Sequence, residues 1–454
     1  MNQAQEKQFE KMTKQPVPKL LLRLSIPTIL SMMVTNIYNI ADTAFVGMLG
    51  TSQSGATGIV FGFMAILQAV AFMCGQGAGS IMSRKLGEKN IKEATEYTST
   101  GFFLSFGIGV LMGIGTLVFM NPLLRILGST ETIAPYAKIY VSYIAIAAPF
   151  FTSSLTMNNL LRYEGKAKLG TVGMMTGAIL NIGIDAILML GLKMGIAGAG
   201  IATATAQFIS FCILLYMFLS GKTQTKIGIQ YFSRDVMVIW NVIAIGFPSL
   251  LRQGLNSVAT MLLNRCAGLY GDAAVSAMSC VSRIGFFSMA IAIGIGQGFQ
   301  PISSFNLGAG KKERVRKAFW TAFWGEECVL FVLAIPMIIF AAPLIQSLRD
   351  DAQVIEIGVR ALRLICISQL FVPLTMMVEM GFQSMGEKAM ASFCSSLRSG
   401  VLFIPTLLIF AKIRGLSGVQ EAQPLSIVLS FVVGIFLCRI YLSRLQVDSI
   451  AVEK

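Results

Sequence analysis

Histidine and charge are the clearest absences from this 454-residue sequence. There is no histidine, so the usual proton shuttle and the commonest metal ligand are missing, and any proton chemistry falls to carboxylates. Charged residues make up only 13% of the chain and hydrophobic residues 55%, whereas soluble domains are about 25% charged. A water-soluble fold could not cover so much apolar surface, so the composition predicts a polytopic membrane protein.

Sequence motifs of enzymes and of ATP-driven pumps are missing as well. The eight cysteines lie singly, with no CxxC pair, and we expect them to be small core residues rather than metal ligands. The basic segment GAGKKERVRKA does not match a phosphate-binding loop, and the chain has no HExxH motif. We therefore expect neither an enzyme nor an ATP-driven pump, and no cofactor.

Twelve apolar runs have the length of a membrane helix. A spanning helix needs about 20 apolar residues, whereas a barrel strand has about 10 with alternating polarity. The sequence therefore predicts an all-α fold with twelve transmembrane helices, at 24–49, 54–83, 97–120, 134–160, 169–192, 197–219, 236–265, 273–303, 318–346, 357–383, 390–411 and 424–442.

The formal net charge of +14 follows from topology rather than from a nucleic-acid partner. Most Lys and Arg residues lie in short segments on the side of the chain's N-terminus, and Arg252, Arg265 and Arg283 fall within predicted spans. Because basic residues accumulate on the cytoplasmic side of a membrane, we expect both termini in the cytoplasm.

The sequence also repeats itself with an offset of 221 residues. This shift places Pro27 on Pro248, Gly50 on Gly271, and one GQG motif on another. Two parallel six-helix bundles with a cavity between them are predicted from such a duplication. The expected parts are a cytoplasmic tail, a first lobe, a cytoplasmic linker, a second lobe and a C-terminal tail, at 1–23, 24–220, 221–235, 236–442 and 443–454.

Two acidic residues lie inside predicted spans of the first lobe. Asp42 is in span one, and Asp185 is in span five within LNIGIDAILML, with Asn181 one turn before it on the same helix face. Counted from the outer ends of their spans, Asp42, Asp185 and Thr203 of span six all lie roughly 10 Å deep. The four side chains are therefore predicted to form one site.

Two close carboxylates in a medium of low dielectric constant cannot both stay ionised cheaply. Either one of them holds a proton, or the pair binds a monovalent cation, and a shell of carboxylate, amide and hydroxyl oxygens suits Na⁺. Binding at Asp42, Asn181, Asp185 and Thr203 would then couple transport to H⁺ or Na⁺. The alternative is that the two acids only bond neighbouring helices.

Other residues are weaker candidates. Asn36, Tyr38 and Asn39 are expected to line the first-lobe cavity near Asp42. Pro27 either gates access by bending span one or forms a static kink.

Four further charged residues fall within predicted spans. Glu379 either attracts a cationic drug that enters from the cytoplasm or pairs with a loop arginine at the membrane interface. Glu326 is expected to pair with the basic segment before it, and Arg252 and Arg283 to form buried ion pairs.

These features resemble the multidrug and toxic compound extrusion family, MATE, in its MepA-like branch of bacterial drug efflux pumps. The resemblance rests on IP at Ile26, NIYNIADTAFVG from Asn36, GQG in span two and LNIGIDAILM in span five, and it covers essentially the whole chain. It implies that the first-lobe positions Asp42, Asn181, Asp185 and Thr203 couple the pump to a cation.

The resemblance also implies the activity. We expect a secondary active transporter in the bacterial cell (inner) membrane that exchanges H⁺ or Na⁺ for lipophilic organic cation drugs by alternating access, as a monomer among membrane lipids. The alternative is a flippase for lipid-linked oligosaccharides or lipids from the same wider superfamily.

Overall fold

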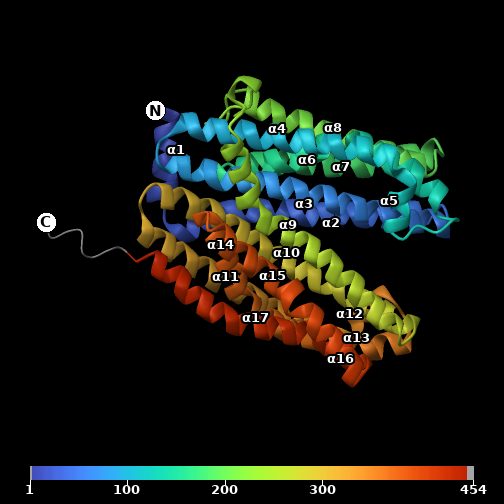
Figure 1. Cartoon of the computed structure of the whole chain (residues 1–454). Coiled ribbons are helices and arrows are strands. Elements are labelled where there is room, and N and C mark those ends of the chain that lie inside the picture. The colour runs from blue at the N-terminus through green and yellow to red at the C-terminus, as the bar shows by residue number, and fades with distance from the viewer. Residues whose placement is uncertain (1–2, 447–454) are drawn as a thin grey trace. The chain divides into compact units, whose positions relative to one another are not determined.

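The computed structural model describes residues 3–446, and every regular element in that range is a helix (Figure 1). In chain order the helices are α1 (Gln3–Lys14), α2 (Val17–Gly47), α3 (Thr51–Gly87), α4 (Ile91–Val118), α5 (Met120–Ile126), α6 (Ala134–Tyr163), α7 (Ala167–Asp185), η1 (Ala186–Gly191), α8 (Ile196–Leu219), η2 (Ile229–Tyr231), α9 (Val236–Gly268), α10 (Asp272–Gly308), α11 (Lys312–Ile339), α12 (Ala341–Leu348), α13 (Ala352–Gln369), α14 (Val372–Met385), α15 (Lys388–Ser396), η3 (Leu397–Val401), α16 (Phe403–Arg414) and α17 (Leu416–Arg444).

The predicted all-α membrane fold is confirmed. Within residues 3–446, eleven helical stretches are long and apolar enough to cross a membrane, and α13 with α14 forms a twelfth that is bent by 51°. The bend falls where Pro373 enters the first turn of α14, a position that tolerates the missing N–H group. The tenth predicted span is therefore a broken helix rather than a straight one.

The 221-residue repeat is visible in the limits of the helices. α3 and α10 begin and end 221 residues apart, and so do α4 and α11. The glycines at the turns repeat their conformation too: Gly50 and Gly271 have φ of 136° and 99°, and Gly165 and Gly386 have φ of 80° and 84°. Since side chains with a Cβ rarely adopt such angles, both halves keep glycine at the same turns.

Contacts along the chain divide it into two compact units. Unit 1 contains residues up to Phe9 together with Leu30–Leu250, and unit 2 contains Glu10–Ile29 together with the chain from Leu251 onward. The limits fall inside α2 and α9 rather than in the linker 221–235. A helix of about 30 residues is about 45 Å long, so its two ends can pack against different neighbours. The lobes 24–220 and 236–442 stay a prediction about the sequence repeat.

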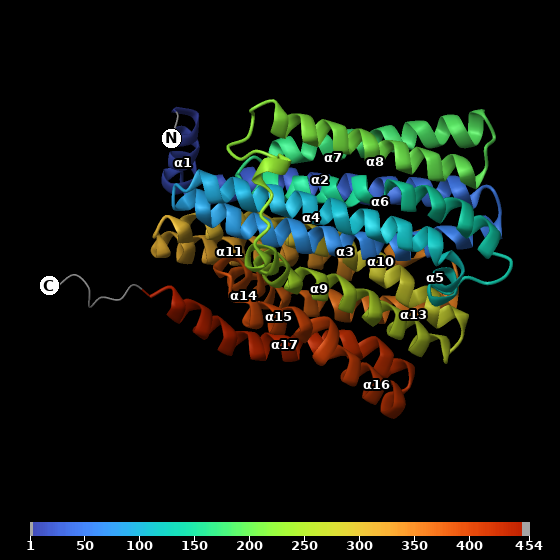
Figure 2. The same cartoon turned by 45° about the horizontal axis from the view of Figure 1, so that its top comes forward.

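In unit 1, the helices α6, α7 and α8 run side by side (Figures 1 and 2). Glycine allows the close approach of α7 to α8. A Cβ added at Gly177 would lie 1.8 Å from Ser210 Oγ and 3.0 Å from the Ala206 carbonyl oxygen. Small residues let membrane helices approach in this way. The contact brings the following turns of α7, which carry Asn181 and Asp185, against α8.

Candidate functional site

Five polar side chains meet inside unit 1, and they come from four helices. α2 supplies Asp42, α6 supplies Tyr140, α7 supplies Asn181 and Asp185, and α8 supplies Thr203. All five are buried, with Asp42 1% and Asp185 0% exposed. The structure thus brings together the four residues that the sequence predicts to form one site.

A chain of hydrogen bonds joins Asp42 to α8. The Tyr140 hydroxyl donates to Asp42 Oδ2 at 2.9 Å and lies 3.2 Å from Thr203 Oγ1. One tyrosine therefore connects the acid of α2 to the hydroxyl of α8. In a medium of low dielectric constant such a bond to an acid is stronger than in water.

Asn181 continues the chain to the second acid. With its amide nitrogen towards Asp185, it donates to Asp185 Oδ2 at 3.1 Å, and its oxygen accepts from the Thr203 backbone N–H at 3.3 Å, which leaves the Thr203 hydroxyl proton for the Tyr140 oxygen. This orientation satisfies the amide at both ends. The two carboxylates are thus linked through Tyr140, Thr203 and Asn181.

Each carboxylate keeps one oxygen without a partner. Asp42 Oδ1 and Asp185 Oδ1 are buried and make no hydrogen bond to any residue that the structure describes, and the same holds for Asn39 Oδ1. A buried charge without compensation costs several kcal/mol, so a proton or a small cation would relieve the site. Among residues 3–446 no cluster of three or more Cys, Asp or Glu could hold a metal ion.

Asp185 also lies at an irregularity of its helix. The α-helical hydrogen bonding of α7 ends at Asp185, and the chain continues as the π-helix η1. Short π-helical turns insert an extra residue and often occur at functional sites. The turn after the acid is therefore wound differently from the turn before it.

The other predicted first-lobe residues take different places. Tyr38 is buried one turn before Asp42, whereas Asn36 and Asn39 are half-buried. Pro27 is buried inside the continuous helix α2 and belongs to unit 2 by its contacts. Their roles as cavity or gating residues stay predictions.

The charged residues of unit 2 differ in part from expectation. Glu379 forms a buried ion pair with Arg252, with 2.7 Å between Nη1 and Oε1, and this partner lies inside α9 rather than in a loop at the interface. The expected pairing of Glu326 is wrong: it is fully buried, and both of its oxygens lack a partner in the described part of the chain. Arg283 is exposed rather than buried, because it faces outward from α10.

Tyr140 was missed by reasoning from the sequence, although a signal for it was present. Span four starts at the outer side near Ala134, so Tyr140 lies six residues into it. Thr203 lies at the same distance from the outer start of span six, and this depth is the basis on which the sequence predicts that Thr203 belongs to the site. Applying the depth argument to every span with an outer start would have found the tyrosine.

Comparison with known proteins supports the repeat and the fold. The model of the MatE family matches residues 27–187 and again 248–409, so the two matches start at Pro27 and Pro248. Multidrug export protein MepA of Staphylococcus aureus (strain MSSA476) is 23% identical over 437 residues, which is 96% of each chain. MepA of Staphylococcus saprophyticus is 23% identical over 442 residues.

Solved structures agree over nearly the full length. A MATE transporter in the straight conformation has a TM-score of 0.90 at 25% identity, covering 96% of this chain and 98% of the other. A transporter of the MOP superfamily from Pyrococcus furiosus has the same score, identity and coverage. Because the family model matches most of the sequence, in both halves, this multi-pass membrane protein belongs to the MatE family, the multidrug and toxic compound extrusion transporters.

Proposed function

We propose that the protein exports bulky organic cations in exchange for H⁺ or Na⁺, which binds at the site formed by Asp42, Asn181, Asp185 and Thr203. The observation that carries the proposal is the pair of buried carboxylates, each with an unpartnered oxygen, connected through Tyr140, Thr203 and Asn181. The relatives named as multidrug export proteins support the direction and the substrate class. The proposed setting is a bacterial inner membrane, with both termini cytoplasmic and the protein acting as a monomer.

The coupling has a simple physical basis. A cation at the site neutralises the acids of α2 and α7, and its oxygen ligands come from helices that are separate in the sequence. Binding therefore favours whichever packing of α2 against α6, α7 and α8 brings those oxygens together. A ligand can shift a conformational equilibrium only through such a difference in affinity between two states. Release of the cation on the other side of the membrane favours the opposite packing.

The test uses inverted membrane vesicles and a fluorescent lipophilic cation, ethidium. A proton gradient and a sodium gradient are imposed separately on vesicles with the wild type, Asp42→Asn or Asp185→Asn. We expect one gradient to drive uptake in the wild type, and we expect uptake to fall by about tenfold or more in both variants, because a buried charged interaction is lost.

The exposed Asp350 provides a matched control. Asp350→Asn removes the same charge outside the site and should transport like the wild type. Normal uptake in both Asp42→Asn and Asp185→Asn would contradict the site. Absence of uptake under either gradient in the wild type would favour the alternative, a flippase for lipid-linked oligosaccharides or lipids. In the Pyrococcus furiosus transporter, a binding pocket of reversed polarity suggests a different function, which keeps that alternative in view.

A further inference from the structure

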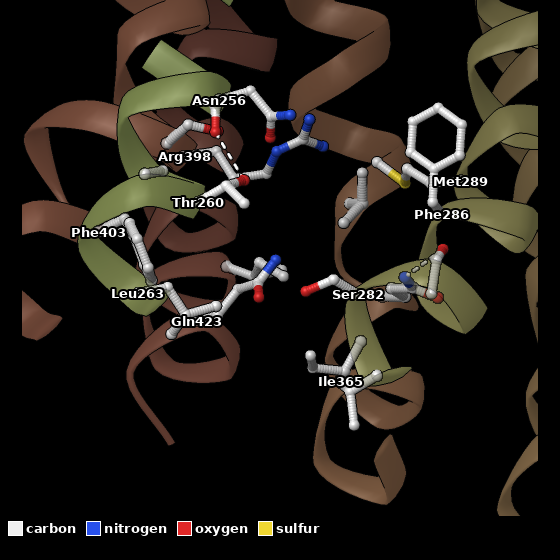
Figure 3. Close-up of a pocket in the computed structure, with 17 residues that line it drawn as sticks. Asn256, Thr260, Leu263, Ser282, Phe286, Met289, Ile365, Arg398, Phe403 and Gln423 are labelled. Carbon is white, nitrogen blue, oxygen red and sulfur yellow. Dashed lines mark hydrogen bonds between the residues drawn. The ribbon is translucent and has the colours of Figure 1, made fainter. Parts of the chain in front are cut away.

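Unit 2 contains a cavity of about 160 Å³ within its own helices (Figure 3). Its lining comes from α9, α10, α13, α14, η3, α16 and α17. Leu263, which the 221-residue repeat places opposite Asp42, is one of the lining residues. The cavity is therefore lined by the residue that corresponds to Asp42 in the second half, and that residue is an apolar leucine.

The charged residue that lines this cavity is positive, whereas the charged residues of the site in unit 1, Asp42 and Asp185, are acids. Arg398 is its charged lining residue, and no Asp or Glu lines it. Arg398 lies in the π-helix η3, and its side chain extends into the cavity (Figure 3). An arginine presents several N–H groups in a planar fork that matches a carboxylate.

The guanidinium of Arg398 forms no ion pair or hydrogen bond with the acids that the structure describes in unit 2. Glu379 is held by Arg252, and Glu326 has no hydrogen-bond partner on either oxygen. Arg398 itself makes no hydrogen bond or ion pair with the residues described in the structure, although it interacts electrostatically with Glu379 and Glu326. Its donors are therefore available to a ligand in the cavity.

Neutral donors and apolar side chains complete the lining. Asn256 and Gln423 carry amides without a side-chain hydrogen bond in the described range, and both residues line the cavity. Phe286 and Phe403 supply apolar surface. A cavity of about 150 Å³ in another protein admits benzene, so this volume accommodates one aromatic ring.

We propose that the cavity of unit 2 binds an aromatic monocarboxylate, whose carboxylate pairs with Arg398 while its ring contacts the apolar wall. The proposal rests on the juxtaposition of an unengaged arginine, two free amides and two phenylalanines around a cavity without an acid. It goes beyond the proposed cation exchange and does not depend on it.

The first test compares three ligands of similar shape on purified full-length wild-type protein in detergent. Radiolabelled benzoate, benzamide and benzylammonium are measured by equilibrium dialysis without any ion gradient. We expect benzoate to bind about tenfold or more tightly than benzamide, because only the carboxylate pairs with a guanidinium, and benzylammonium to bind least. Equal binding of benzoate and benzamide, or no binding of benzoate, overturns the proposal. This comparison needs no substitution.

The second test assigns the binding to Arg398. Arg398→Gln should weaken benzoate binding by about tenfold or more and remove the preference over benzamide. Arg398→Lys should retain part of the preference, because the charge remains but the planar fork is lost. Arg283→Gln is the matched control: Arg283 is exposed on α10, one residue from the lining Ser282, and does not line the cavity. Wild-type affinity in Arg398→Gln, or a loss in Arg283→Gln of the same size, would overturn the assignment.

Failure of this proposal is distinguishable from failure of the proposed function. Benzoate binding is measured at equilibrium, whereas cation exchange is measured as gradient-driven uptake. A chain that binds benzoate but takes up no ethidium under either gradient keeps the cavity assignment and loses the antiport assignment. A chain that takes up ethidium under one gradient but does not bind benzoate keeps the antiport assignment and loses the cavity assignment.

Discussion

Tyr140 is the residue through which Asp42 of α2 contacts α8. Its hydroxyl donates to Asp42 Oδ2 and lies within hydrogen-bond distance of Thr203 Oγ1. Its buried ring also belongs to the apolar core of unit 1. A single side chain thus takes part in both packing and the proposed ion site, so the two roles must be separated experimentally.

Tyr140→Phe is expected to change the concentration of H⁺ or Na⁺ that half-saturates transport by about tenfold or more. The ring is kept, but a buried hydrogen bond to an acid, worth about 1.5–3 kcal/mol, is removed. The measurement is ethidium uptake in inverted vesicles as a function of the coupling ion.

The control for Tyr140→Phe is Tyr143→Phe on the same helix. The Tyr143 hydroxyl makes no hydrogen bond to a residue that the structure describes. The same half-saturating concentration in wild type and Tyr140→Phe would show that the tyrosine is structural only.

At the scale of the helix, the close approach of α7 and α8 determines where Asn181 and Asp185 lie. Ser210 Oγ donates to the Gly173 carbonyl oxygen at 3.2 Å, one turn before Gly177. The hydroxyl thereby occupies the space that a side chain at Gly177 would need. The position of the proposed ion site consequently depends on Gly173 and Gly177, which have no side chains of their own.

Gly177→Ala is expected to destabilise the protein by about 1–3 kcal/mol, as overpacking in a tight interior does. The added Cβ forces α7 away from α8 and so separates Asn181 from Thr203. Thermal unfolding of the purified protein in detergent measures the effect.

Gly183→Ala tests the same change at an open position of α7. A Cβ at Gly183 would meet nothing within 4 Å. This variant should unfold at the wild-type temperature or above it, since alanine favours a helix interior over glycine by about 1 kcal/mol. A lower unfolding temperature for Gly183→Ala than for Gly177→Ala would contradict the conclusion that α7 and α8 pack tightly at Gly177.

Much of the arrangement of the helices was predictable from the sequence, because hydropathy and the spacing of the repeat can be read directly from the order of the residues. The spans, the 221-residue offset and the joint depth of Asp42, Asp185 and Thr203 all follow from counting residues. The break between α13 and α14 and the π-helices η1 and η3 do not, because they depend on how neighbouring helices pack. Arg398 was missed for a related reason: it lies inside the predicted span 390–411, but the cavity that it lines forms only when several helices pack together.

For the whole molecule, the connection between the halves is more ordered than a polar linker suggests. Glu164 at the end of α6 accepts hydrogen bonds from the Gln224 backbone N–H and from Thr225 Oγ1, and pairs with Lys166. Burial raises the pKa of the Glu164 carboxyl, while Lys166 and the linker donors oppose that rise. The Ser99 hydroxyl donates to the Lys226 carbonyl oxygen at 2.9 Å. The linker is therefore attached to unit 1 along its length.

Glu164→Ala is expected to release this linker. The variant loses the acceptors for Gln224 and Thr225, so limited trypsin digestion should cut after Lys222 or Lys226 about tenfold faster. Glu131→Ala, at an exposed position, removes the same charge and should be cut like the wild type. Equal cutting rates in Glu164→Ala and wild type would show that the linker is held by its other contacts.

The equal limits of α3 and α10, and of α4 and α11, have a consequence for the interior of the two halves. The two halves share the limits of these helices, while the position that holds Asp42 in the first half holds Leu263 in the second. The limits of the helices are the same in both halves, whereas the polarity of this interior position differs between them. A duplicated fold of this kind can therefore differ in the charge of its interior from one half to the other while the register of its helices stays the same.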